Sequence, residues 1–190
     1  MFVAMGLGIG LASVAGVRAF LPLALAVLFT TLGLFEFPVP IVTVDGWVLI
    51  AVLGALAVLE IVLDKIRAVE RLFNIVMVPI RALSGALLFT AALGLDVETG
   101  SPLWLVVGAV VAGAVAVLKV LLRPSARTPS TGVSSSFLSA FEDVVALVGG
   151  AIGLFVAYVP AFLVAFLLFF FNRIRKRRGR KFGGLRILGD

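Results

Sequence analysis

The chain has 190 residues, of which 62% are hydrophobic and 14% charged, and a mean hydropathy of +1.24. This balance excludes an ordinary soluble domain and predicts a membrane protein. The absence of cysteine and histidine excludes disulfides, thiol nucleophiles, imidazole or thiolate metal sites and a histidine general base.

The first apolar segment, residues 2–34, is longer than the ~20 residues that a membrane span needs. It is interrupted at residues 16–22, where a glycine, an arginine and a proline follow one another. Proline removes a helical hydrogen bond, so we expect a tilted, kinked or broken helix that crosses the membrane once. Arg18 should face the protein interior. Residues 1–3 have no basic character, so we expect no removable signal peptide.

Further apolar stretches follow along the chain at residues 47–66, 72–95, 102–122, 139–158 and 160–172. The loops after the first and third stretches are acidic, whereas the turns after the second and fourth and the tail are basic. Short basic loops stay in the cytoplasm, which predicts six segments with both termini cytoplasmic.

These stretches predict an all-α, polytopic helical membrane protein with some kinked or broken segments. Its single transmembrane domain would cover residues 1–172, followed by a basic cytoplasmic tail over 173–190. We place it in a bacterial cytoplasmic membrane. The tail, which supplies most of the net charge of +6, should contact anionic lipid rather than nucleic acid.

The second stretch ends on two carboxylates, Glu60 and Asp64, which share one helix face because they are four residues apart. A carboxylate in the membrane costs about 2.5–3.5 kcal/mol, so both need partners or a function. A shift of 59 residues aligns them with Lys119 and Arg123, within a weak repeat of residues 47–95 and 102–158. A true repeat would be parallel, and chance similarity remains an alternative.

Other polar residues join them in the cytoplasmic half, where a water-filled vestibule would house them at least cost. Ser139 and Glu142 have the spacing of a capping box, which predicts a helix that begins at Ser139. With Asp143 and serines 134–136, this start would offer an all-oxygen site for a proton or hard cation, or only an ordinary cap. The candidate substrate- or ion-binding residues are Arg18, Glu60, Asp64, Arg81, Lys119, Arg123, Ser139, Glu142 and Asp143.

The order and spacing of these residues resemble a bacterial family of small integral membrane proteins known as a domain of unknown function (DUF4126). The resemblance rests on the segments that contain Arg18, Glu60 with Asp64, Arg81 with Gly85, Lys119 with Arg123, and Ser139 with Glu142 and Asp143. It covers about residues 6–171. It implies a membrane protein with polar residues at these positions and carries no activity with it.

Three classes of function compete. Broken helices and intramembrane charges of both signs favour a small ion- or proton-coupled transporter of a small solute or an anionic lipid headgroup. The same charges could instead form a static network in a structural or assembly protein that binds partner helices or lipids. A magnesium-dependent transferase is the third class, without a recognised motif. We expect membrane lipids as partners and no cofactor or nucleic acid; a homodimer is an option for so short a chain.

Overall fold

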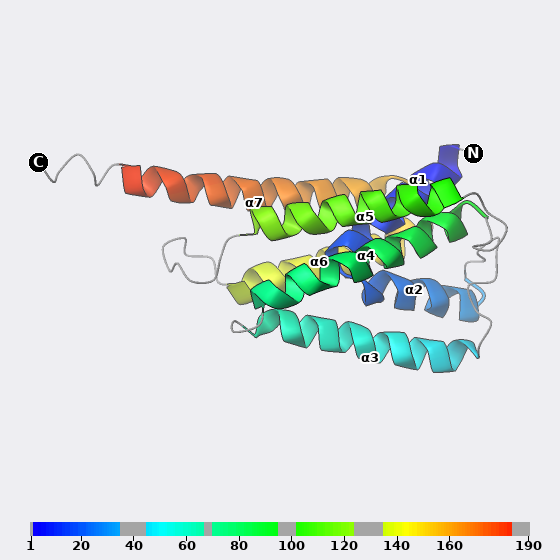
Figure 1. The fold of residues 1–190 in the computed structure, drawn as a ribbon. Coiled ribbons are helices and arrows are strands. Elements are labelled where there is room, and N and C mark those ends of the chain that lie inside the picture. Colours follow the sequence, from blue (N-terminus) through cyan, green and yellow to red (C-terminus); the bar gives the residue numbers. More distant parts are fainter. Residues whose placement is uncertain (1, 35–44, 67–69, 95–101, 124–134, 184–190) are drawn as a thin grey trace, which may run out of the picture.

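The computed structural model describes residues 2–34, 45–66, 70–94, 102–123 and 135–183. These residues form seven helices, which confirms the all-α prediction (Figure 1). In chain order they are α1 (Phe2–Val17), α2 (Phe20–Thr31), α3 (Gly46–Lys65), α4 (Glu70–Ala92), α5 (Pro102–Leu122), α6 (Ser135–Gly153) and α7 (Val159–Gly183). Residues 46–65, 72–92 and 102–122 are long and apolar enough to cross a membrane, and α1 and α2 are shorter apolar helices.

The first apolar segment is broken into α1 and α2 between Val17 and Phe20. Pro22 explains the break, because its ring would clash with the carbonyl of Arg18 four residues earlier in a continuous helix. In the first turn of α2 the same proline is tolerated, since N–H groups there have no partner within the helix.

The two helices form a V rather than one crossing of the bundle (Figure 1). The beginning of α1 and the end of α2 both contact the turn between α6 and α7. The Tyr158 hydroxyl donates to the Phe2 carbonyl at 3.0 Å, and the rings of Phe29 and Phe155 meet edge to face at 5.6 Å between centroids. Phe2 therefore lies at the opposite end of the bundle from the end of α7. The first segment therefore does not run from one end of the bundle to the other, as a single crossing would. The cytoplasmic position of both termini stays a prediction.

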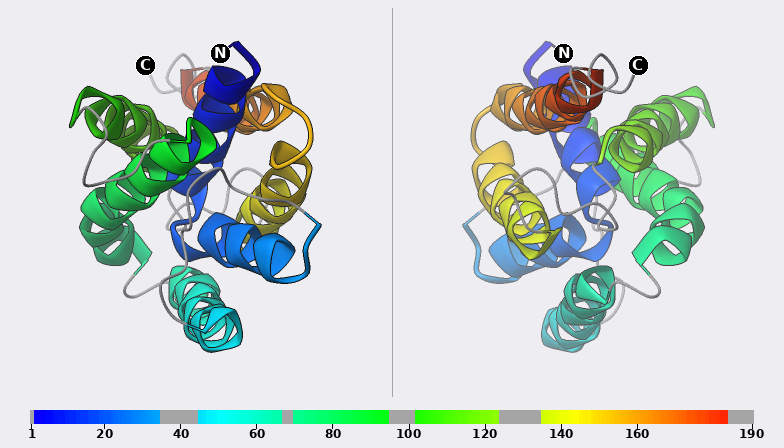
Figure 2. Two further views of the ribbon diagram at one scale, coloured as in Figure 1. Left: turned by 90° about the vertical axis from the view of Figure 1, so that its right-hand side faces the viewer. Right: turned by 90° about the vertical axis from the view of Figure 1, so that its left-hand side faces the viewer.

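α1 lies at the centre of the bundle, between the α4–α5 and α6–α7 pairs (Figure 2). The helix backbones come close where small residues meet. A Cβ atom on Gly108 would lie 2.7 Å from the Gly85 carbonyl oxygen, and one on Gly16 would lie 2.5 Å from the Ala112 carbonyl oxygen. Small residues at helix crossings are typical of packing in membranes. α3 is at the margin of the bundle, where it packs mainly against α2.

The polarity of the bundle is inverted relative to a soluble protein. Large apolar side chains such as Val52, Leu83, Val110 and Phe166 are exposed along the outer faces of the helices. The fully buried large side chains include two arginines, a lysine and two glutamates. This distribution suits a lipid surround, because an exposed apolar face costs nothing in hydrocarbon.

α6 begins at Ser135, one turn earlier than predicted. Ser139 and Glu142 are thus inside the helix, and the predicted capping box at Ser139 is wrong. Both side chains turn inward to partners on other helices, described below, instead of bonding to their own backbone. Ser134 and the side chains of residues 135 and 136 lie outside the part of the chain that the structure describes, and so does the all-oxygen site suggested for them.

The connection between α6 and α7 is a turn over residues 154–158, in which Tyr158 has a φ of +66°. Its ring packs on Gly6, where a Cβ atom would lie 2.5 Å from the ring. α7 continues to Gly183, beyond the predicted end near residue 172, so the basic run extends the last helix. The direction of α3 and α5 is the same (Figure 1), and the internal repeat stays a prediction.

Candidate functional site

The break between α1 and α2 is the centre of a buried polar network. Side chains from other helices bind the backbone groups that the break leaves without helical partners. Glu60 accepts hydrogen bonds from the Ala19 N–H at 3.0 Å and the Phe20 N–H at 3.3 Å. Lys119 Nζ donates to the Val17 carbonyl at 3.0 Å, and Ser84 Oγ to the Ala19 carbonyl at 2.6 Å.

These contacts also match the helix dipoles. The N-terminus of α2 carries partial positive charge and receives a carboxylate, whereas the C-terminus of α1 carries partial negative charge and receives an ammonium group. Ala19, the residue at the cap of α2, offers no side-chain acceptor of its own. Glu60 of α3 therefore caps α2 from outside the segment.

Glu60 connects the break to α4. Arg81 donates to Glu60 Oε1 from Nε at 3.3 Å and from Nη2 at 3.1 Å. Its Nη1 donates to the Asn74 side-chain oxygen at 3.1 Å, and the Asn74 amide donates to Asp64 Oδ1 at 2.6 Å. A chain of polar contacts therefore links the two carboxylates of α3 through α4.

Asp64 has partners on four other elements. Arg18 Nη2 donates to its Oδ2 at 2.9 Å, and Ser139 Oγ donates to the same oxygen at 3.0 Å. Arg123 Nη1 is 2.9 Å from both carboxylate oxygens. Together with Asn74, these residues place the α1–α2 break, α4, α5 and α6 around the end of α3.

The two acids of α6 complete the network. Glu142 Oε2 lies 2.8 Å from Lys119 Nζ and 3.3 Å from Arg123 Nη1. Asp143 Oδ1 lies 2.6 Å from Arg18 Nη2, and its Oδ2 lies 3.6 Å from Lys65 Nζ. Lys65 is the most exposed member, with 45% of its side chain accessible, against 18% for Asp143.

The charges within the buried part of the network, which excludes Lys65, balance. Four cations (Arg18, Arg81, Lys119 and Arg123) pair with four carboxylates (Glu60, Asp64, Glu142 and Asp143), all with side chains at most 18% exposed. The predicted water-filled vestibule does not house these side chains, because most of them are shielded from solvent altogether. The network is closed, and among the described residues Asp143 and Lys65 form its contact with the surface.

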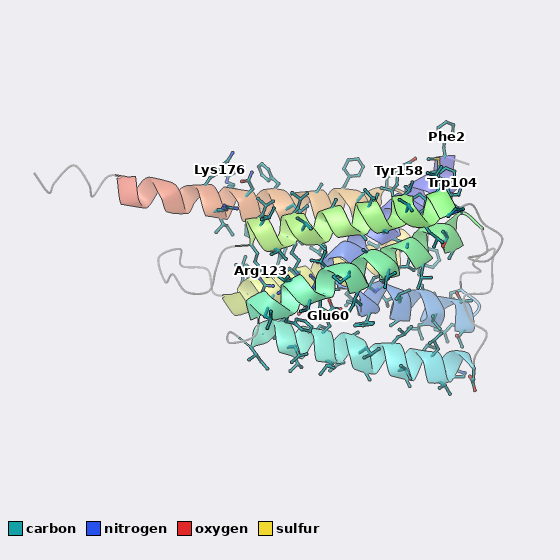
Figure 3. The ribbon with its side chains drawn as sticks, viewed as in Figure 1. Phe2, Glu60, Trp104, Arg123, Tyr158 and Lys176 are labelled. Carbon is teal, nitrogen blue, oxygen red and sulfur yellow. The ribbon has the colours of Figure 1, made fainter. Side chains whose placement is uncertain are left out.

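Figure 3 shows where the network lies along the bundle. Glu60 and Arg123 are in the half that also contains Lys176, whereas Phe2, Tyr158 and Trp104 lie at the other end. The network therefore surrounds the ends of α3 and α5 and the beginnings of α4 and α6, as the loop charges had predicted for the polar residues.

All nine residues selected from the sequence belong to this one network. The predicted burial of Glu60 and Asp64 against cations of other helices is confirmed. Lys119, Arg123 and Arg81 were the cations expected to pair with the two carboxylates. Asp64 pairs with Arg123 and Glu60 with Arg81, whereas Lys119 pairs with Glu142.

Sequence reasoning missed Asn74, Ser84 and the backbone groups at the break. Asn74 could have been found, because it precedes Arg81 by two helical turns and so shares its face. The contacts to the backbone groups could not have been found from the sequence, because they depend on how α3 and α5 pack beside the break. Within the described ranges, no three carboxylates gather to hold a metal ion, since cations separate them.

Comparison with known proteins identifies a family without an activity. A search of curated proteins and a search of solved structures both found no match. A family model described as a domain of unknown function (DUF4126) matches residues 5–177, which include every member of the network. The chain therefore belongs to the DUF4126 family.

Proposed function

We propose that the protein is a transporter in a bacterial cytoplasmic membrane, which moves a small solute or an anionic lipid headgroup coupled to protons or cations. The observation that carries this proposal is the broken helix α1–α2, whose free backbone groups are bound by Glu60, Lys119 and Ser84. Irregular backbone at membrane depth is tolerated only inside protein or beside a cavity. Transporters place substrate and coupling ions at such discontinuous helices.

The contacts that hold α3 in the bundle support the proposal that this helix moves during transport. Its buried residues are Ala57, Glu60 and Asp64, so two of the three are carboxylates that bind cations and backbone groups of other elements. Protonation or ligand binding that weakens these ion pairs would release α3 from the break. A helix whose docking depends on the charge state of the site is a two-state element of the kind that coupling needs.

The arrangement also suggests a membrane topology. We place α3 to α7 as five crossings and the α1–α2 pair as a V that enters and leaves by one face. The cytoplasmic side would contain the end of α3 near Ile66, the end of α5 near Arg123 and the end of α7, because the basic loops and the basic tail follow there. The beginning of α1 would then be outside. Lipids are the expected surround, and a homodimer would supply a longer pathway.

The proposal is tested by flux into proteoliposomes that contain a pH-sensitive dye. Acetate, inorganic phosphate, neutral sugars and amino acids are added outside, and internal pH is recorded. The wild-type protein should move protons in response to at least one solute. Glu60→Gln should reduce this flux at least tenfold while the protein stays monodisperse, and Leu59→Ala, a change on the lipid-facing side, should not.

A structural or assembly role is the second candidate. The observation that favours it is the balanced pairing of four cations with four carboxylates inside one chain, which requires no ligand. Its basic α7 would contact lipid headgroups or a partner. Failure of every solute to produce flux, together with a stable partner co-purified from the native membrane, would support this role against transport.

A further inference from the structure

Arg18 uses only part of its hydrogen-bonding capacity. A guanidinium group has five N–H donors on three nitrogens. The side-chain partners recorded for Arg18 are all on Nη2, namely Asp64 at 2.9 Å, Ser139 at 3.2 Å, Asp143 at 2.6 Å and, more distantly, Glu142 at 3.8 Å. Its Nε and Nη1 are buried and have no hydrogen-bond partner among the described residues. Such groups are costly in a protein interior and indicate that a further acceptor binds there.

Unlike Asp64 and Ser139, Asp143 contacts Arg18 without a hydrogen bond. Its Oδ1 is close to Nη2, yet it has no hydrogen bond with correct geometry, so the attraction is mainly Coulombic. Asp64 differs, because the same guanidinium, Ser139 and Asn74 all donate to it. Asp143 is also the least buried acid of the network and is next to exposed Lys65. It is the carboxylate that can leave Arg18 at least cost.

We propose that Arg18 is the binding site for a small, singly charged oxyanion, which takes the place of Asp143 while that carboxylate accepts a proton from the aqueous phase. This rests on the proposed transport function and specifies its substrate class. The exchange preserves charge: one anion enters, one carboxylate becomes neutral, and the balance of four cations against four anions is restored. A buried site that stays neutral avoids the cost of an unpaired charge.

The surroundings of Asp143 suit this role. Arg18 faces it from the α1–α2 break, and Lys65 and Asp64 face the same region from α3. Glu142 is its neighbour on α6 and lies 3.8 Å from Arg18 Nη2, so a second carboxylate faces the same cation. α2 has no ionisable residue, and Arg173, Arg175 and Lys176 of α7 are exposed.

The ligand chemistry follows from these groups. Carboxylate and phosphate oxygens match a guanidinium, and Lys65 provides a first cationic contact at the surface. A free solute such as acetate or dihydrogen phosphate has this chemistry, and so does the phosphodiester of an anionic lipid headgroup. The shared feature is a singly charged oxyanion.

The test is a binding experiment in a neutral detergent, separate from any flux. Acetate and inorganic phosphate form one arm, and micelles with phosphatidylglycerol, compared with phosphatidylcholine, form the other. Isothermal titration in buffers of different ionisation enthalpy gives the affinity and the number of protons taken up. The wild-type protein should take up one proton per anion, and its affinity should fall about tenfold per pH unit once Asp143 is ionised.

Asp143→Asn should bind the same anion with no proton uptake and with an affinity that no longer depends on pH, because the amide resembles the protonated acid. Asp45→Asn is the matched control, since Asp45 caps α3 at the other end of the bundle; it should behave like the wild type. Arg18→Gln should lose binding. Absence of any bound oxyanion in both arms at acid pH, or unchanged proton uptake in Asp143→Asn, would overturn the proposal.

These results separate the two proposals. Flux that survives Asp143→Asn with its proton coupling intact would refute the role of Asp143 and leave the transport function standing. Proton-linked anion binding without flux in proteoliposomes would support the role of Asp143 and refute the transport function. The two binding arms show whether the oxyanion is a free solute or a headgroup.

Discussion

At the scale of residues, the network shows how charges are retained inside an apolar bundle. Each carboxylate has at least one cation within 3.1 Å, and the carboxylates of α3 also accept N–H groups. A buried ion pair adds little net stability over apolar packing, but removal of one partner is costly because the other charge remains buried. Substitution of one residue of a pair should therefore lower the stability of the protein by more than the pair as a whole contributes to it.

Glu60→Ala should lower the free energy of unfolding by about 3–5 kcal/mol. The change leaves Arg81 without its carboxylate and the N–H groups of Ala19 and Phe20 without an acceptor. Leu59→Ala, one residue earlier and exposed, should change it by about 0.5 kcal/mol or less. Melting in detergent, followed by loss of helical circular dichroism, measures both. Equal melting temperatures would show that Glu60 does not cap α2.

Lys119 and Glu142 should be energetically coupled. Lys119→Met leaves the Glu142 carboxylate and the Val17 carbonyl without this donor, and Glu142→Gln removes the charge that would otherwise be stranded. The double variant should be more stable than the sum of the single effects predicts, by about 0.5–3 kcal/mol. A double-mutant cycle of unfolding free energies measures the coupling. Additive effects would contradict a direct pair.

At the scale of elements, the helix break and the close helix crossings decide the shape of the site. α5 presents Lys119 to the break because the small residues of α4, α5 and α1 let the backbones of these helices approach one another. Gly85 and Gly108 lie at this crossing, and Gly16 packs on Ala112 beside it. The site depends on this packing, although none of these glycines is part of it.

Gly85→Ala should destabilise the bundle by about 1–3 kcal/mol, because its new methyl group would overlap the Ala112 side chain. Gly54→Ala is the control in α3, where no atom of another residue lies within 4 Å of the added Cβ. Alanine in a helix interior is favoured over glycine by about 0.5–1 kcal/mol, so this change should be neutral or stabilising. Thermal melts of the two variants should shift in opposite directions.

At the scale of the whole molecule, the V of α1 and α2 changes the topology. The beginning of α1 and the end of α2 lie at one end, with the α6–α7 turn, whereas α7 ends at the other (Figure 1). The proposed topology, with an odd number of crossings and the two ends of the chain on opposite sides of the membrane, rests on this arrangement.

Labelling of single cysteines should confirm this topology, and the printed sequence has no cysteine to give background. A membrane-impermeant maleimide should label Phe2→Cys and Leu34→Cys in intact cells. Ile66→Cys and Lys176→Cys should react only after permeabilisation. All four positions are exposed in the bundle. Protection of Phe2→Cys in intact cells would instead support a single crossing by the first segment.

The sequence by itself determined the all-helical class, with helices apolar enough to cross a membrane, and nine residues of the network. Both follow from free-energy costs that depend on a single segment of the chain. An apolar run of spanning length indicates a membrane helix, and an ionisable residue within such a run needs a partner wherever the helix packs. Pro22 and Arg18 likewise marked the break, because proline acts on the backbone of its own segment.

Only the tertiary structure decided which charges pair, how α2 is capped and at which end of the bundle α1 begins. Glu60 could have paired with Lys119 or with Arg81, and the depth of these residues in the membrane does not distinguish the two. The rotation and lateral position of α3 and α4 bring Glu60 to Arg81. The start of α6 was missed for a similar reason, since the inward contacts of Ser139 and Glu142 replace the local cap that their spacing suggested. Pairing depends on the packing of separate helices, and that information is not local in the chain.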